Sequence, residues 1–344
     1  MKKRTKEKIN NLGDCMLEIK NKKILFIALP GYSQGIQQKM EELGAQVDYF
    51  NDKPNEGFIC KACGRYNVKP YEIVLEKYYK QIIDTVKEKD YDYILVLRGE
   101  YTPINSVNLM KKTFPNAKLI LYMWDSLFNN KAVISRWKAY DQVYTFDRKD
   151  YLKHQKEIDF LPLYYYDDYV PSEEIKNYKY DIAFIGTGLQ DRVRIINEVK
   201  EQCKRTGKKM YAYVFLPHKL VYLYNKILNP NYKNISIKNI QFKKIPFQKV
   251  YEIYHNAKCV IDIEHSKQSG LTMRTMEMIG LRKKLITTNK DIVNYDFYHE
   301  DNILVVDRNN FVLDESFIDR PYHMLDESIY KKYALSNWIM EVLK

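Results

Sequence analysis

Two stretches of the sequence combine glycine with polar or charged residues in patterns that can bind an anionic ligand. A Gly-Thr-Gly triplet at 186–188 follows the apolar run DIAFI and precedes a helical pattern, so its backbone N–H groups and the helix N-terminus could receive a diphosphate. The second stretch, 269–277, is a glycine loop that opens a helix and carries Arg274 and Glu277 on one face. Arg can bind phosphate oxygens, and Glu can accept hydrogen bonds from ribose hydroxyls. A tight turn and a surface ion pair are the structural alternatives.

The two glycine stretches can form one site only if the fold brings the ends of several strands together. Short apolar runs with polar residues at their carboxyl ends alternate with helical patterns, in the first half of the chain at 23–30, 91–100, 117–126 and 142–147. In the second half, strand patterns are expected at 235–242 and 257–264, a long helix within 179–209 that stops at Gly207, and a helix from about Thr272 to Leu281. This alternation predicts an α/β fold with parallel sheets covered on both faces. Ligands of such sheets bind beyond the carboxyl ends of the strands, where both glycine stretches lie.

The length of 344 residues and a restart of the pattern near residue 179 predict two domains. Proline, aspartate and serine interrupt the periodicity at 161–177, which favours a boundary there. We therefore predict an N-terminal domain at 1–165 and a C-terminal domain at 166–325. A final helix within 326–344 is expected to return to the N-terminal domain.

Composition limits the class of protein and its partners. The net charge of +12 favours anionic partners, but the lysines are scattered among Glu and Asp, which is typical of a solvated basic surface. No RNA- or DNA-binding module is recognisable, so nucleic acid is not an expected partner. An odd number of cysteines and a single CxxC at 60–63 favour reduced thiols and no metal site. With no apolar membrane span, we expect a cytoplasmic protein, whose charge would suit peripheral contact with the inner face of the plasma membrane.

A longer block, CVIDIEHSKQSGLTMRTMEMIGLRKKLITTNKDIVNYDFYHEDNI at 259–303, carries a family resemblance. It closely resembles the C-terminal signature of bacterial capsular-polysaccharide and lipopolysaccharide biosynthesis proteins, which are similar to GT-B glycosyltransferases. The segments 122–126, 144–150 and 181–192 are similar to that family too. Arg-x-x-Glu at 274–277 also resembles, more weakly, the CgeB-like spore-coat glycosyltransferases.

The resemblance implies a GT-B fold, with two Rossmann-like domains facing a central cleft. The C-terminal domain would hold a nucleotide-sugar donor and the N-terminal domain a glycan or lipid-linked acceptor, without a metal ion or other cofactor. Glu277 matches the ribose-binding Glu of retaining GT-B enzymes, whereas Ser269 stands where those enzymes have a second Glu, so retention does not follow. The donor-binding residues expected on this basis are Gly186, Thr187, Gly188, Arg192, His265, Gln268, Ser269, Gly270, Leu271, Thr272, Arg274 and Glu277.

Catalysis in such a site would need a cation for the departing diphosphate and a base for the acceptor hydroxyl. We expect Arg274 to stabilise the leaving group, with Arg192, His265 and Lys267 as helpers. The candidate bases all follow strands of the N-terminal domain; they are Glu100, Asp125 (beside Trp124, a possible sugar platform) and Asp147. Helix capping is the structural alternative for these acids.

The sequence therefore predicts a metal-independent glycosyltransferase that transfers a sugar from a nucleotide-sugar to a surface glycan, such as capsule, lipopolysaccharide or exopolysaccharide. Two alternatives remain open. One is a catalytically silent GT-B domain that binds nucleotide-sugar or glycan as an assembly or regulatory partner. The other, less favoured by the residues, is a nucleotide-sugar epimerase of related fold.

Overall fold

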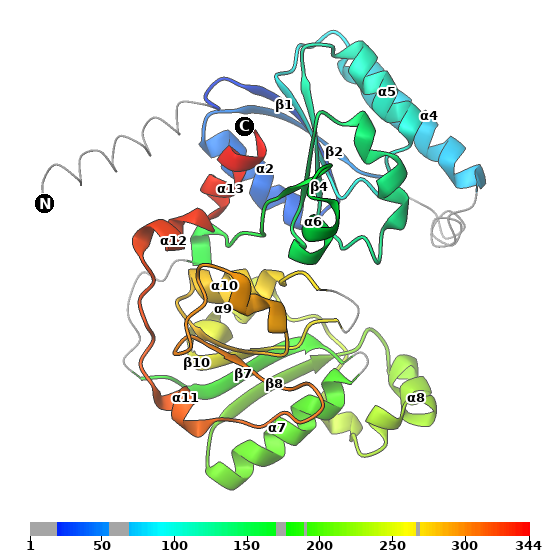
Figure 1. Ribbon diagram of the computed structural model, residues 1–344. Coiled ribbons are helices and arrows are strands. Elements are labelled where there is room, and N and C mark those ends of the chain that lie inside the picture. Colours follow the sequence, from blue (N-terminus) through cyan, green and yellow to red (C-terminus); the bar gives the residue numbers. More distant parts are fainter. Residues whose placement is uncertain (1–18, 55–68, 170–176, 189–190, 266–268) are drawn as a thin grey trace, which may run out of the picture. The chain divides into compact units, whose positions relative to one another are not determined.

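The computed structural model in Figure 1 describes residues 19–54, 69–169, 177–188, 191–265 and 269–344. The described chain forms two compact units. Unit 1 contains the residues up to Leu163, together with 269–270 and Leu335–Lys344, and unit 2 contains 164–265 and Leu271–Ala334. The CxxC at 60–63, Lys267 and Gln268 lie outside the described residues.

Unit 1 is built on a parallel sheet with strand order β2-β1-β3-β4-β5-β6. Its strands are β1 (Lys23–Ala28), β2 (Gln46–Asn51), β3 (Tyr93–Leu97), β4 (Lys118–Met123), β5 (Gln142–Thr145) and β6 (Asp159–Phe160). Its helices are α2 (Tyr32–Glu42), α4 (Lys69–Val86), α5 (Ile104–Thr113), α6 (Arg148–His154) and α13 (Leu335–Val342), with the short 3-10 helices η1 (Lys131–Ser135) and η2 (Trp137–Ala139). The strands β1, β3 and β4 are apolar and buried along nearly their whole length, as expected for a sheet covered on both faces.

The last helix, α13, completes the core of unit 1. Trp338 is almost fully buried and packs edge-on against Tyr122 of β4, with ring centroids 4.8 Å apart. The hydroxyl of Tyr144 on β5 donates a hydrogen bond to the carbonyl of Glu341 at 3.2 Å. Unit 1 is therefore assembled from both ends of the described chain.

Unit 2 has a second parallel sheet, with strand order β12-β11-β10-β7-β8-β9. Its strands are β7 (Tyr180–Thr187), β8 (Met210–Phe215), β9 (Ile240–Gln241), β10 (Ala257–Asp262), β11 (Lys284–Thr287) and β12 (Ile303–Val305). The helices are α7 (Arg192–Thr206), α8 (Lys219–Leu228), α9 (Phe247–His255), α10 (Met273–Gly280), α11 (Glu315–Asp319) and α12 (Glu327–Lys332). The 3-10 helices are η3 (Asp167–Tyr169), η4 (Pro230–Tyr232), η5 (Ile237–Asn239) and η6 (Lys290–Asn294).

The predicted alternation of strands and helices and the two parallel sheets are confirmed. In each sheet the strand order reverses once, between β1 and β3 in unit 1 and between β7 and β10 in unit 2. Neighbouring connections leave such a point on opposite faces, which opens a crevice at the carboxyl ends of the two strands. Within the described residues, no helix is both long and apolar enough to cross a membrane.

Candidate functional site

A cluster of charged side chains lies around the carboxyl ends of the paired strands β7 and β10 in unit 2. Three arginines belong to it: Arg192 at the start of α7, Arg274 in α10 and Arg308 after β12. The carboxylates that interact with them are Asp191, Asp262, Glu264 and Glu277. These residues end or follow strands or lie in the first half or the middle of the next helices, so the sheet topology brings them together.

Arg308 ties two parts of the cluster together and was not predicted from the sequence. Its Nε and Nη2 donate to the two carboxylate oxygens of Asp191 at 2.8 and 2.7 Å. Its Nη1 donates to the backbone carbonyl and the carboxylate of Glu264 at 2.9 and 3.2 Å. These hydrogen bonds lower the pKa of Asp191 and raise that of Arg308. The charge of Arg308 is thus balanced by two carboxylates, and its hydrogen bonds hold Asp191 and Glu264 in place.

Arg274 lies on the inner side of the cluster. Its guanidinium is 5.8 Å from the ring centroids of both Phe184 and Tyr254. Nη2 donates to the carbonyl of Ile185, and Nη1 is 3.5 Å from a carboxylate oxygen of Asp262. The Nε–H is buried and has no hydrogen-bond partner among the described residues. Arg274 is thus anchored to the protein through Ile185 and Asp262.

The start of α10 is fixed by Thr272, one of the predicted donor residues. The hydroxyl of Thr272 donates to Asp262 at 2.5 Å and accepts a hydrogen bond from the backbone N–H of Thr275 at 3.4 Å. Thr272 is therefore the N-cap of a helix that the sequence predicted from about Thr272 to Leu281 and that spans Met273–Gly280. Asp262, which the sequence analysis treated as part of an apolar strand, joins β10 to this helix.

Glu277 follows Arg274 by one helical turn, as predicted. It is half-buried, and burial raises the pKa of its carboxyl group, which Arg274 and a hydrogen bond from the Tyr169 hydroxyl partly offset. A half-buried carboxylate that already has one donor can accept further hydrogen bonds from a ligand.

Arg192 is the cation of the cluster that forms no ion pair among the described residues. Its Nη1 donates to Thr187 Oγ1 at 2.9 Å, and its Nε–H is buried without a hydrogen-bond partner among the described residues. Burial lowers the pKa of Arg192, and the charges of Arg274 and Arg308 lower it further, whereas Asp262 opposes them. An under-neutralised guanidinium of this kind favours an added anion.

The helix that Arg192 begins also has an open N-terminus. Asp191 is the N-cap of α7, but its side chain makes no capping hydrogen bond, because both of its oxygens bind Arg308. The first N–H groups of α7 therefore lack a side-chain acceptor at Asp191, and the helix dipole adds positive potential at the same place.

The Gly-Thr-Gly triplet is placed differently from the expected phosphate loop. Gly186 and Thr187 are the last two residues of β7, and the N–H of Gly188 donates to the carbonyl of Phe215 at 2.9 Å. A Cβ on Gly188 would lie 2.7 Å from Val214 Cγ1. The expectation that Gly188 offers its N–H to a diphosphate is therefore wrong: this N–H extends the β7–β8 ladder, and the glycine is required for packing.

The remaining predicted donor residues have mixed positions. Leu271 is buried in unit 2, and His265 is half-buried after β10. Ser269 and Gly270 group with unit 1, where the Ser269 hydroxyl and the Gly270 N–H both donate to the carboxylate of Asp147. The Ser269 hydroxyl and the Gly270 N–H are therefore already hydrogen-bonded to a carboxylate of the protein.

The three candidate bases follow β3, β4 and β5, which are adjacent in the unit 1 sheet. Asp147 is the N-cap of α6 and accepts from the N–H groups of Lys149 and Asp150 as well as from 269–270, so its contacts are those of a capping residue. Asp125 is half-buried and accepts from its neighbour Ser126 and from Asn129. Glu100 forms an ion pair with Arg98.

A fourth carboxylate, Asp52, was missed because it follows an amphipathic strand of mixed residues. It comes directly after β2, and both of its carboxylate oxygens are buried without a hydrogen-bond partner among the described residues. Burial raises the pKa of Asp52 to about 6, with Arg98 and Lys53 as the nearest opposing charges. Arg98 has a positive φ of 77°, which places this charged residue in a turn conformation that non-glycine residues rarely adopt.

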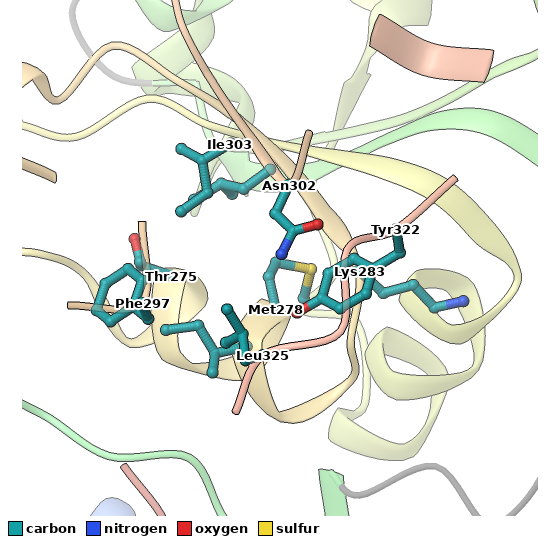
Figure 2. A pocket seen from close by; sticks show the side chains of 10 residues that line it. Thr275, Met278, Lys283, Phe297, Asn302, Ile303, Tyr322 and Leu325 are labelled. Carbon is teal, nitrogen blue, oxygen red and sulfur yellow. The ribbon is translucent and has the colours of Figure 1, made fainter. Parts of the chain in front are cut away.

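A small cavity in unit 2 lies away from this cluster. Figure 2 shows side chains from α10 and from the amino ends of β11 and β12 around it, including Met278, Lys283 and Asn302. It has room for roughly one water molecule. Most of its lining lies toward the amino ends of the strands, and Thr275, which donates a hydrogen bond to Asp262 at 3.3 Å, is the lining residue that contacts the charged cluster.

Comparison with solved structures identifies the fold. No family model and no curated protein matches this sequence. A trehalose-6-phosphate synthase studied for glycosyl transfer with retention aligns over 93% of this chain and 98% of its own, with a TM-score of 0.59 and 11% identity. A glycosyltransferase from Rickettsia africae aligns over 94% and 92%, with a TM-score of 0.53 and 14% identity. UDP-GlcNAc 2-epimerase from Methanocaldococcus jannaschii aligns over 93% and 99%, with a TM-score of 0.52 and 9% identity.

At identities of 9% to 14%, these similarities establish architecture alone. They extend over nearly the whole chain and over both parallel sheets. The chain therefore has the GT-B fold, with one Rossmann-like sheet in each of its two units.

Proposed function

We propose that this protein is a glycosyltransferase that binds a nucleotide-sugar at the charged cluster of unit 2. The observation that carries the proposal is the under-neutralised guanidinium of Arg192 beside the open N-terminus of α7. A nucleoside diphosphate carries the charge that this position favours. Two of the structurally similar proteins are named for glycosyl transfer, and the third is named for a nucleotide-sugar substrate.

In the proposed reaction, the bond between the anomeric carbon and the diphosphate oxygen breaks, and a bond from the same carbon to the acceptor oxygen forms. The diphosphate leaves with the bonding electron pair, and Arg192 and the α7 dipole stabilise its charge. Arg274 acts from the inner side of the cluster, and Glu277 accepts hydrogen bonds from the ribose. We propose no metal ion in this step.

The acceptor hydroxyl must lose a proton to a base. We propose a carboxylate at the carboxyl ends of the unit 1 strands for this role, either Glu100 or Asp125. Asp52 is a third candidate base, because its pKa of about 6 suits proton transfer near neutral pH. The family resemblance of 259–303 favours a capsular, lipopolysaccharide or exopolysaccharide acceptor. The cytoplasm is the expected compartment for a nucleotide-sugar donor.

Nucleotide binding is the first test. We expect the thermal midpoint to rise with one of UDP, GDP, CMP or dTDP, or with one of their sugar conjugates, and to do so equally in EDTA, because a ligand that binds the folded state stabilises it. Arg192→Ala should weaken binding roughly tenfold or more, as expected for loss of a charged hydrogen bond. Arg205→Ala, an exposed position near the other end of α7, is the matched control and should bind normally.

The outcomes separate the alternatives. A shift that needs a divalent metal would contradict the metal-free site. Binding without transfer to any glycan would favour the silent nucleotide-sugar module. Turnover of the nucleotide-sugar alone to its epimer, with no acceptor, would favour the epimerase. No shift with any nucleotide, for a folded wild-type protein, would overturn the proposed donor site.

A further inference from the structure

Helix α8 lies at the periphery of unit 2 (Figure 1) and exposes an apolar stripe. Five large apolar residues lie at positions i, i+3, i+4, i+7 and i+8 of this helix, and each is between 53% and 73% exposed; they are Leu220, Leu223, Tyr224, Ile227 and Leu228. This spacing places them on one helix face. Single exposed apolar residues are ordinary, but a continuous stripe of this kind marks an interaction surface.

The opposite face of α8 is firmly held by the protein, so the stripe is a stable feature of unit 2. Tyr222 is buried, and its hydroxyl donates to the carbonyl of Ile235 at 2.8 Å. The ammonium group of Lys226 donates to the carbonyls of Tyr232, Lys233 and Ile235 at 3.2, 2.7 and 2.9 Å. The chain that follows the helix thus folds back onto its inner side.

The segment that contains α8 is strongly basic. Residues 202–251 include ten lysines and one arginine but no aspartate or glutamate. The lysines are therefore less evenly spread than the composition alone indicates, since this segment of 50 residues carries a charge of +11 against +12 for the whole chain. The exposed lysines of the segment that form no ion pair with the described residues are Lys209, Lys219, Lys233, Lys238, Lys243 and Lys244.

We propose that the α8 face docks on an anionic lipid bilayer, with the stripe inserted at the headgroup level and the lysines facing the lipid phosphates. An amphipathic helix with apolar side chains on one face, within a lysine-rich segment, has the composition of interfacial membrane helices. A second copy of this chain would bring two such basic segments together, which their repulsion opposes. Nucleic acid would account for the lysines but leaves five large apolar side chains in water.

Vesicle co-sedimentation of the full-length protein tests the proposal. We expect binding to vesicles of phosphatidylcholine with phosphatidylglycerol, weak binding to phosphatidylcholine alone, and partial release at high salt. Leu220→Gln/Leu223→Gln/Ile227→Gln should lower the fraction of protein bound to vesicles at low and at high salt, with a partition coefficient reduced roughly tenfold or more. Lys233→Glu/Lys238→Glu should reduce the preference for the anionic vesicles, because it lowers the charge of the segment by four.

Matched variants in and beside α4 of unit 1 control for general changes in hydrophobicity and charge. Ile73→Gln/Val74→Gln replaces exposed apolar residues of α4, and Lys80→Glu/Lys87→Glu reverses two exposed lysines of unit 1. Both should bind like wild type. All substituted side chains are exposed. An unchanged circular dichroism spectrum would show that each variant is folded.

Three results would overturn the proposal. They are no binding of wild type to anionic vesicles at low salt, equal binding by the α8 triple variant, and self-association of the protein in solution that the same triple variant abolishes. The last would assign the stripe to a second copy of the chain. Because the assay contains no nucleotide or glycan, the proposal stands or fails independently of the proposed activity.

Discussion

The Asp52 side chain ends β2 in unit 1 with both carboxylate oxygens buried and without a hydrogen-bond partner among the described residues. Arg98 and Lys53 act on it only through their charge and do not offset the effect of burial, so its pKa rises from the ordinary value of an aspartate to about 6. A group with a higher pKa in the folded state binds its proton more tightly there. The folded protein is therefore stabilised by protonation of Asp52.

This gives a pH prediction with a defined sign. As pH rises from about 4 to about 6, the unfolded chain has already lost the proton that the folded chain keeps, so the free energy of unfolding falls. The loss attributable to Asp52 is roughly 2–3 kcal/mol. Urea unfolding of Asp52→Asn should show a correspondingly flatter pH profile than wild type. Asp84→Asn, on the exposed face of α4, is the control, and parallel profiles for all three proteins would contradict the prediction.

At the scale of elements, α10 positions two proposed donor residues, and its N-cap is the point at which it can be weakened. Thr272→Ala removes the cap of α10 and one hydrogen bond to Asp262. We expect the free energy of unfolding to fall by about 1–2 kcal/mol and nucleotide binding to weaken with it. Thr272→Ser keeps the hydroxyl and should restore both. If Thr272→Ala matches wild type in denaturant titrations, the cap does not hold the helix.

The elements themselves were largely predictable, because apolar runs and helical periodicity are local signals. The helix from about Thr272 to Leu281 and the glycine end of α7 at Gly207 are found as expected. The strand predicted at 235–242 is shorter, since η5 takes Ile237–Asn239 and only Ile240–Gln241 pairs with β8. Pairing depends on the neighbouring strand, which the local sequence does not encode.

The partners within the charged cluster were not predictable in the same way. Arg308 and Asp191 are 117 residues apart, and only the order of strands in the sheet brings them together. Asp262 was overlooked because it ends an apolar run and its role depends on Thr272 from the following loop. The sequence analysis identified Arg192, Arg274 and Glu277 by residue type, but the ion pairs that leave Arg192 under-neutralised are properties of the fold.

At the scale of the whole molecule, the three tryptophans Trp124, Trp137 and Trp338 all belong to unit 1. Tryptophan fluorescence therefore reports the unfolding of unit 1, whereas far-ultraviolet circular dichroism reports both units. A substitution that removes a large buried side chain destabilises the unit whose core it weakens. The fluorescence and dichroism transitions should therefore shift differently for a substitution in unit 1 and one in unit 2.

We expect Trp338→Ala to destabilise unit 1 by about 3–5 kcal/mol and to move the fluorescence transition to lower urea, with a later dichroism transition retained for unit 2. The matched variant Phe317→Ala, in the buried core of unit 2, should shift dichroism and leave fluorescence unchanged. Coincident transitions in both variants would show that the units unfold as one cooperative body.

The inclusion of α13 in unit 1 has a consequence for the order in which the protein is made. The chain leaves the ribosome with its N-terminus first. The described part of unit 2, which ends at Ala334, therefore emerges before Leu335–Lys344. Unit 2 can therefore complete its sheet and core while unit 1, although begun first, still lacks Trp338. Until the final helix arrives, the surface of Tyr122 that Trp338 covers stays open, and nascent unit 1 is the part of the chain that most needs protection by a chaperone.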